Sequence, residues 1–409
     1  MHSPAIASVL ASLLLLPASP LAQAPPPPGG EAAAPKAPEA DEAEARRKLE
    51  EQIARELGGG ARPSGAAAEK PAAVAPAQGG GGNPAARLLL LPDISAVGSF
   101  SVAYDSYDVE ALSPRAGPFG PEGKPTPQLD EVELAIQSVV DPYARADIFV
   151  SFGPEEVAVE EAYLTTLGLP AGLQLRAGKL FSPFGRQNQQ HPHAREFVDG
   201  SLVSARLLAD EVLSGPGLDL AWLAPVPWFA ELHLAGQGTA PAEEDPERLT
   251  AVARLLQYFP LGASTTLGVG LSAARRDEAR GEFRDLGGVD VHLRWRPPEG
   301  RRSLSFQGEL VGRRFRGNAL ASKMGAYAQL FLRQDAHLGY GVRWDWAPTP
   351  RDLPAGEEHR IGALLAWLPS EFQRIRLQVS YDRRPGGEDG WEGILALELG
   401  IGVHGAHPF

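Results

Sequence analysis

Residues 289 to 296 form the stretch that decides the fold, and they read VDVHLRWR. Apolar side chains stand at Val289, Val291, Leu293 and Trp295, and polar or charged side chains stand at Asp290, His292, Arg294 and Arg296. A period of two residues is typical of a β-strand that has one apolar face and one polar face. The stretch therefore predicts a strand between two different environments.

The same alternation recurs along the chain, for example over residues 303 to 310, 342 to 346 and 374 to 382. A soluble β-sandwich would also alternate, but its strands are usually about five or six residues long. Many alternating segments here run to ten residues or more, which is about the length that a tilted strand needs to cross a bilayer. Strand length therefore favours a transmembrane barrel over a sandwich.

Counting these segments predicts sixteen strands. Their expected ranges are 94–105, 128–138, 143–152, 156–167, 172–181, 217–223, 228–237, 249–258, 264–274, 286–296, 302–312, 323–334, 338–346, 358–367, 372–382 and 391–404. Short turns such as Asp141-Pro142 and Pro369-Ser370 alternate with connections that are mostly longer and more polar. Of the short turns, only the one near Ala336 lacks an evident turn former. We therefore expect an all-β, antiparallel transmembrane barrel over residues 88 to 409, with the short turns in the periplasm.

Composition narrows the class of protein further. The 409 residues contain no cysteine, 38 Lys and Arg against 51 Asp and Glu, and a formal charge of −13. A disulfide-stapled scaffold is excluded, and the acidic balance argues against a nucleic-acid partner, because such binding depends on clustered cations.

The first 87 residues predict export and a tether. Residues 1 to 24 have the pattern of a signal peptide, with an apolar run from Val9 to Leu16 and cleavage expected after Ala24. Residues 25 to 87 are rich in Ala, Pro and Gly, and we expect a disordered periplasmic extension. Within it, apolar residues spaced four apart predict a short helix over 42 to 57 that either is marginal or self-associates.

One motif resembles a known family. Residues 178 to 185, GKLFSPFG, resemble the strand-into-loop motif of the phosphate-selective porin family and related general porins. A long polar loop follows them, and EEAYL at 160 to 164 precedes them. The resemblance implies a sixteen-stranded outer-membrane barrel that is commonly a homotrimer, with a loop folded into the lumen. Lysine is scarce in the barrel, with only Lys124, Lys179 and Lys323, so a phosphate-selective lysine ladder does not carry over.

The sequence offers little for catalysis. His191 and His193 flank Pro192 near Asp199, which makes them weak candidates for a metal site whose third ligand is unspecified. Ser201, Ser204 and Asp210 have no motif that would fix a nucleophile and a base. We therefore expect no enzyme activity, no resident metal and no cofactor.

Alternation assigns charged side chains to the lumen. The predicted pore lining is Glu131, Glu133, Arg145, Arg176, Asp290, Arg294, Arg296, Arg343, Arg374 and Arg376. Pairs such as Arg294 and Arg296 would stack their guanidinium groups about 6.6 Å apart along one strand. Unpaired, these arginines would give a weak anion preference, which the carboxylates oppose. Paired, they would only solvate the wall.

The segment 182 to 216 is expected to narrow the bore, with Arg186, Gln187, Asn188, His191, His193 and Arg195 as its constriction residues. The function predicted from the sequence is that of a porin in the bacterial outer membrane. It would contact outer-membrane lipid and let small hydrophilic solutes or ions diffuse passively. The alternative is a ligand-binding or metal-binding uptake barrel.

Overall fold

The computed structural model describes residues 92–107, 117–118, 123–154, 156–208, 213–238, 249–277, 283–298, 300–316, 322–349, 356–384 and 389–402. The predicted signal peptide, the tether and its helix over 42 to 57 lie outside these residues. Among the described residues, no helix has both the length and the apolar character that a membrane-spanning helix requires.

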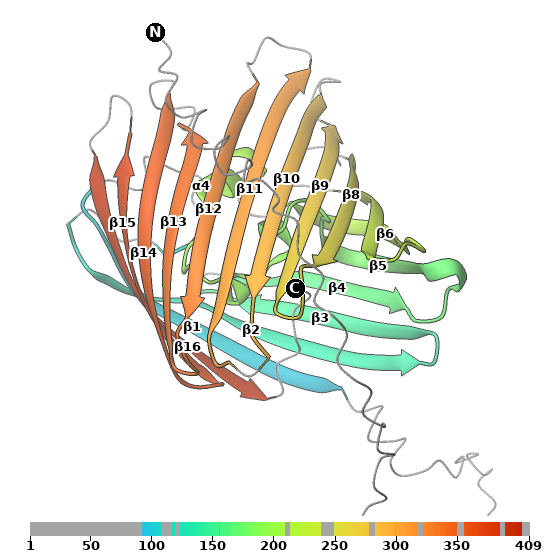
Figure 1. The fold of residues 1–409 in the computed structure, drawn as a ribbon, viewed down its shortest axis with the longest axis horizontal. Coiled ribbons are helices and arrows are strands. Elements are labelled where there is room, and N and C mark those ends of the chain that lie inside the picture. Colours follow the sequence, from blue (N-terminus) through green and yellow to red (C-terminus); the bar gives the residue numbers. More distant parts are fainter. Residues whose placement is uncertain are drawn as a thin grey trace, which may run out of the picture. The chain divides into compact units, whose positions relative to one another are not determined.

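The described part of the chain contains sixteen antiparallel strands (Figure 1). They are β1 (Asp93–Asp105), β2 (Thr126–Asp141), β3 (Ala144–Phe152), β4 (Val157–Thr166), β5 (Leu173–Phe181), β6 (Ser214–Leu223), β7 (Phe229–Gly238), β8 (Leu249–Pro260), β9 (Thr265–Asp277), β10 (Phe283–Trp295), β11 (Ser303–Arg316), β12 (Lys323–Arg333), β13 (Leu338–Pro348), β14 (Glu357–Ser370), β15 (Gln373–Arg383) and β16 (Gly390–Gly402). Each expected strand overlaps one of them, so the predicted count and order are confirmed.

The sheet closes on itself because β1 pairs with both β2 and β16. The closing ladder runs from Ser95 opposite Gly402 to Asp105 opposite Glu392. Closure leaves no strand edge with unpaired backbone groups, which is the condition a sheet must meet to span a bilayer. The predicted closed barrel is therefore confirmed.

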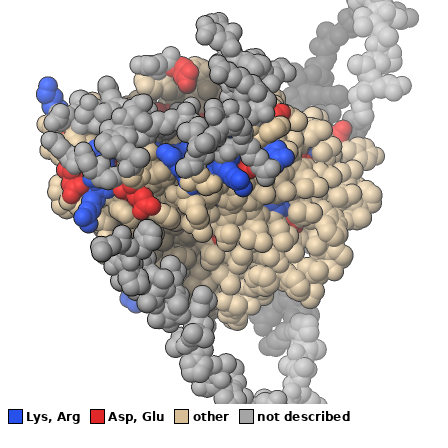
Figure 2. Space-filling view, turned by 90° about the horizontal axis from the view of Figure 1, so that it is seen from above, with Lys and Arg blue, Asp and Glu red and all other residues tan. Residues whose placement is uncertain are grey.

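The two faces of the wall differ as the alternation predicts. On β14, Ile361 is 61% exposed, whereas its neighbour Arg360 is 1% exposed because it faces the lumen and pairs there. On β16, Trp391, Leu395, Leu397 and Leu399 are all exposed on the outer face. Figure 2 shows a wide area of the surface without charged side chains beside a strip where they gather. An apolar outer band is what contact with lipid requires.

Two short turns differ from what the sequence pattern predicts, the one between β12 and β13 and the one between β14 and β15. Asp335 accepts backbone hydrogen bonds from His337, at 2.7 Å, and from Leu338, at 3.0 Å, so it is the turn former between β12 and β13. These bonds lower the pKa of Asp335. Strand β14 continues through Pro369 to Ser370. The turn between β14 and β15 is therefore Glu371-Phe372, two residues later than expected.

The long connection between β5 and β6 carries short helical turns. These are η3 (Gln187–Gln189), η4 (Pro192–Ala194) and α4 (Leu202–Leu207). Helix α4 contacts β11, β12 and β13, behind which it is visible in Figure 1. Strand β6 begins at Ser214, so the expected segment 182 to 216 ends three residues earlier, at 213, and residues 209–212 lie outside the described part. We refer to residues 182 to 208, its described part, as the inward segment.

Candidate functional site

The inward segment lies inside the barrel and is bonded to its wall. It begins at Ser182, after a strand in which Gly178 has φ +144° and any Cβ would lie 2.1 Å from the carbonyl oxygen of Ala162. Only glycine allows β5 to approach β4 so closely there. The motif that suggested the family resemblance thus has a steric reason for its first glycine.

Glu309 on β11 holds the beginning of the inward segment. Its Oε1 accepts hydrogen bonds from the backbone N–H of Arg186, at 2.9 Å, and of Gln187, at 2.5 Å. The hydroxyl of Tyr327 donates to the same oxygen at 2.8 Å. The side chain of Arg186 extends further along the wall and donates to Gln307 and Tyr258. Tyr258 therefore faces the lumen.

Asp199 holds the middle of the inward segment to strands β13, β14 and β15 of the wall. Its Oδ1 accepts from Arg343 on β13 and Gln378 on β15, both at 2.7 Å, and its Oδ2 accepts from Arg360 on β14 at 2.6 Å. All four side chains are buried. One carboxylate thus joins the segment to three neighbouring strands through charge-assisted bonds.

The two arginines predicted on β15 also bind this segment. Arg374 and Arg376 both pair with Glu398 of β16. Arg374 donates to the carbonyl oxygens of His193 and Arg195, and Arg376 donates to those of Arg195 and Glu196. Their charges are therefore partly balanced, and their donors fix the loop backbone.

His191 makes a third contact between the inward segment and the wall, at strands β2 and β4. Its Nδ1 lies 2.8 Å from Glu160 Oε2 and 2.8 Å from Glu133 Oε2, and its Nε2 lies 3.0 Å from Glu161 Oε2. Burial lowers the pKa of His191, but the contacts with these three carboxylates outweigh it and raise the pKa to about 12. The rings of Phe149 and Phe181 pack on the imidazole, with centroids 4.9 and 4.7 Å away.

Two β-bulges bring this many carboxylates to one place. On β4, Glu161 is opposite Phe149 and Val159 is opposite Val150, so Glu160 is an extra residue. On β2, Asp130 is extra in the same way, between Leu129 and Glu131. A bulge interrupts the alternation of side chains, so both members of an adjacent acidic pair can face the lumen.

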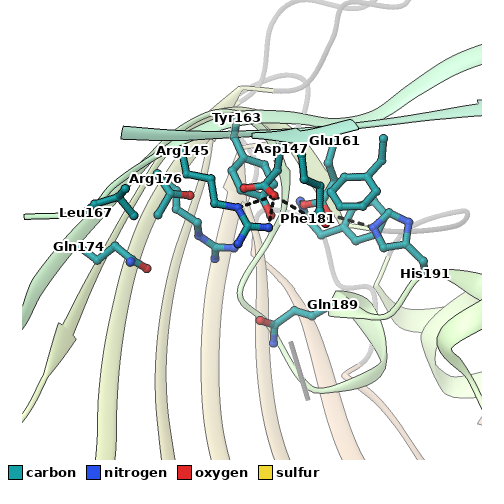
Figure 3. Close-up of a pocket in the computed structure, with 13 residues that line it drawn as sticks. Arg145, Asp147, Glu161, Tyr163, Leu167, Gln174, Arg176, Phe181, Gln189 and His191 are labelled. Carbon is teal, nitrogen blue, oxygen red and sulfur yellow. Dashed lines mark hydrogen bonds and ion pairs between the residues drawn. The ribbon is translucent and has the colours of Figure 1, made fainter. Parts of the chain in front are cut away.

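A cavity of about 340 Å³ lies beside the inward segment. Figure 3 shows Arg145, Arg176 and Gln174 on one side of it and Glu161, Phe181 and His191 on the other. Arg145 pairs with Asp147 at 2.6 Å, and Arg176 pairs with Asp219 at 2.6 Å. The cavity wall therefore carries both signs of charge in adjacent pairs.

The other predicted site residues lie in different surroundings, some buried in ion pairs, one exposed beyond its strand and others in contact with the loop backbone. Asp290 is buried against Arg254, and Arg343 against Asp199 and Asp345, while Glu131 and Glu133 lie near His191. Arg294 lies on β10, whereas Arg296 is exposed one residue beyond the strand, which ends at Trp295. Asn188 binds the loop itself, donating to the carbonyl oxygens of Ser182 and Leu213. His193 Nδ1 lies 3.5 Å from Glu133 Oε2, and Arg195 donates to the carbonyl oxygen of Gln190.

Several residues that hold the site were not predicted from the sequence. Arg254, Arg360 and Glu398 follow the alternation and could have been found by extending it along their strands. Glu160 could not, because it lies at a bulge. Its signal in the sequence is the pair of adjacent acidic residues, which breaks the period of two.

No family model matches the sequence. An uncharacterized protein of Aquifex aeolicus is 30% identical, over 78% of this chain and 80% of that protein. Among solved structures, OprB of Pseudomonas putida has a TM-score of 0.55 at 11% identity and covers 76% of this chain and 94% of its own. The anion-selective porin from Comamonas acidovorans has a TM-score of 0.52 at 9% identity, over 76% and 99%.

The outer-membrane channel DcaP of Acinetobacter baumannii aligns with a TM-score of 0.51 at 10% identity, over 76% of this chain and 97% of its own. At such low identity the likeness concerns the fold, and the fold is porin-like. Membership of the phosphate-selective family in particular is not among these findings. The chain belongs to the same protein family as the uncharacterized protein of Aquifex aeolicus, and its fold is that of a porin-like, sixteen-stranded β-barrel.

Proposed function

We propose that this protein is a porin of the bacterial outer membrane, which lets small hydrophilic solutes diffuse passively through a bore narrowed by the inward segment. The observation that carries the proposal is the attachment of that segment to the inner wall. Its residues bond to Glu161 on β4, Glu309 on β11 and Arg343 on β13, at widely separated places around the barrel. A loop held at such separated places crosses the lumen and reduces the cross-section open to solutes.

The outer face supports the placement in a membrane. Large apolar side chains such as Val342, Trp367 and Ile401 are more than half exposed, and burying such surface in lipid is favourable. Outer-membrane porins and channels among the structural neighbours support the same location. The predicted periplasmic extension remains part of this proposal.

Charge pairing in the lumen favours a general diffusion pore over a phosphate-selective one. Several arginines of the wall are paired with carboxylates, as in Arg254 with Asp290 and Arg176 with Asp219. Paired charges attract a single anion less strongly than an unpaired ladder, but they orient dipolar solutes. We propose only a weak anion preference, to which Arg374 and Arg376 contribute. Both guanidinium groups pair with Glu398, and the nearby Glu196 and Asp130 weaken their field.

Liposome swelling tests the proposal. Vesicles that contain the refolded protein should swell in sugars of increasing size up to a cut-off, and deleting residues 187 to 199 should raise that cut-off and the rate. Deleting residues 240 to 247, between β7 and β8, serves as the control and should change neither. A folded deletion of 187 to 199 with wild-type rates would contradict the role of the segment. Saturable uptake of one ligand alone would favour the receptor alternative.

A further inference from the structure

We propose that the cluster of His191, Glu133 and Glu160 is a binding site for a divalent transition-metal ion, which would tie the inward segment to the barrel wall. The ligand atoms that these three residues offer all lie within 4.8 Å of one another. The proposal goes beyond the diffusion function and does not depend on it, because binding is measured on the folded protein and not on the channel.

The spacing of the donor atoms suits a metal. Glu133 Oε2 and Glu160 Oε2 are each 2.8 Å from His191 Nδ1, and His193 Nδ1 is 3.5 Å from Glu133 Oε2. Ligands about 2.0 to 2.2 Å from a tetrahedral zinc ion are separated from one another by about 3.4 Å. The cluster needs only small side-chain adjustments to reach that geometry.

One buried carboxylate oxygen supports the site independently. The Glu133 side chain is 2% exposed, and its Oε2, although 2.8 Å from His191 Nδ1, meets the hydrogen-bond geometry with none of the described residues. A single N–H at Nδ1 of His191 can point to one carboxylate only, and the hydrogen-bond geometry is met at Glu160. A buried carboxylate oxygen without a donor is costly, and a cation between the donors would satisfy it.

The local charge also favours a dication. Four glutamates surround this part of the segment: Glu131, Glu133, Glu160 and Glu161. Positive charges also act on these glutamates, from His191, Arg195 and Arg176, so four carboxylates face three cations even when His191 is protonated. A metal ion would take the place of the proton on His191 and bring two positive charges.

The donor set indicates the class of ion. Imidazole nitrogen together with carboxylate oxygen suits Zn²⁺, Mn²⁺ or Fe²⁺, whereas Mg²⁺ and Ca²⁺ prefer oxygen alone. Access is available because His191 and Glu161 line the 340 Å³ cavity beside the inward segment (Figure 3). Phe149 and Phe181 both pack on the imidazole, which limits the rearrangement that binding requires.

The test uses the mature chain without a polyhistidine tag, folded in detergent, stripped with a chelator and titrated with Zn²⁺ by equilibrium dialysis and calorimetry. We expect one zinc ion per chain and at least tenfold weaker binding in Glu133→Gln and in His191→Asn. His337→Asn is the matched control, because His337 is exposed in the β12–β13 turn, and it should bind as wild type. His404→Asn with His407→Asn should also leave the stoichiometry unchanged.

Two further measurements keep the proposal falsifiable. If Glu133→Gln fails to fold, Glu160→Gln replaces it, because Glu160 is partly exposed and tolerates substitution better. X-ray absorption of the zinc-loaded protein should show nitrogen and oxygen ligands. The proposal is overturned if no zinc binds above the detergent background. It is equally overturned if the folded Glu160→Gln and His191→Asn variants bind as wild type, or if equimolar Mg²⁺ displaces the zinc.

Discussion

Replacing Asp199 by Asn should release the middle of the inward segment from the wall. The substitution preserves the size of the side chain but removes the charge that accepts hydrogen bonds from Arg343, at 2.7 Å, and Arg360, at 2.6 Å. The new amide also places a donor opposite a guanidinium donor. The two arginines keep Asp345 and Asp382 as partners, so neither is left with an uncompensated charge.

The size of the effect follows from these contacts. A hydrogen bond to a charged group contributes about 1.5 to 3 kcal/mol, and breaking a buried ion pair outright costs about 3 to 5 kcal/mol. Because each arginine keeps one carboxylate, we expect a loss of roughly 3 kcal/mol. That corresponds to about a hundredfold shift in the equilibrium between the attached and the detached segment, at about 1.4 kcal/mol per factor of ten.

Single-channel recording in planar bilayers measures this shift. The Asp199→Asn variant should show a higher mean conductance and more frequent transitions between levels than the wild type, in a barrel that still shifts its electrophoretic mobility on heating. Asp93→Asn is the control, because Asp93 is exposed at the beginning of β1. If Asp199→Asn folds and its conductance and noise match the wild type, the carboxylate does not hold the segment in the bore.

Three further outcomes are expected. Changing Arg374 and Arg376 together to Gln should shift the reversal potential in a salt gradient towards cation preference, because Glu398 then lacks both partners; an unchanged potential would mean that these arginines only line the wall. Gly178→Ala should lower the yield of heat-modifiable barrel, since the new Cβ would lie 2.1 Å from the Ala162 carbonyl oxygen, whereas Gly236→Ala, with nothing within 4 Å, should fold normally; equal yields would contradict the steric argument. Cross-linking in native membranes should give the trimer that the family resemblance implies, and a gel with the monomer band alone would count against it.

The wall of the barrel could be predicted from the sequence because one physical rule governs it. Each strand separates lipid from a polar lumen, so residues such as Ile361 and Arg360 had to alternate, and closure followed from the count of strands. The ends of the strands could be predicted less well than the strands themselves. Arg296 was assigned to the strand by continuing the alternation, but the backbone ends β10 at Trp295.

The interior could be predicted only in part, because it depends on contacts between residues far apart in the sequence. The loop could be identified by its length and polarity, but the pairing of Asp199 with Arg360 joins residues 161 positions apart. The glutamate cluster depends on bulges at Asp130 and Glu160, where the period of two fails locally. Adjacent acidic residues within a strand of this kind are a usable sign of such a bulge.

Single-channel recording of the purified wild-type protein tests the central claim most directly. A porin whose bore is narrowed but open should give stepwise, ohmic openings in planar bilayers at every salt concentration, without added ligand. A folded, heat-modifiable barrel that inserts into the bilayer and passes no current would contradict the account.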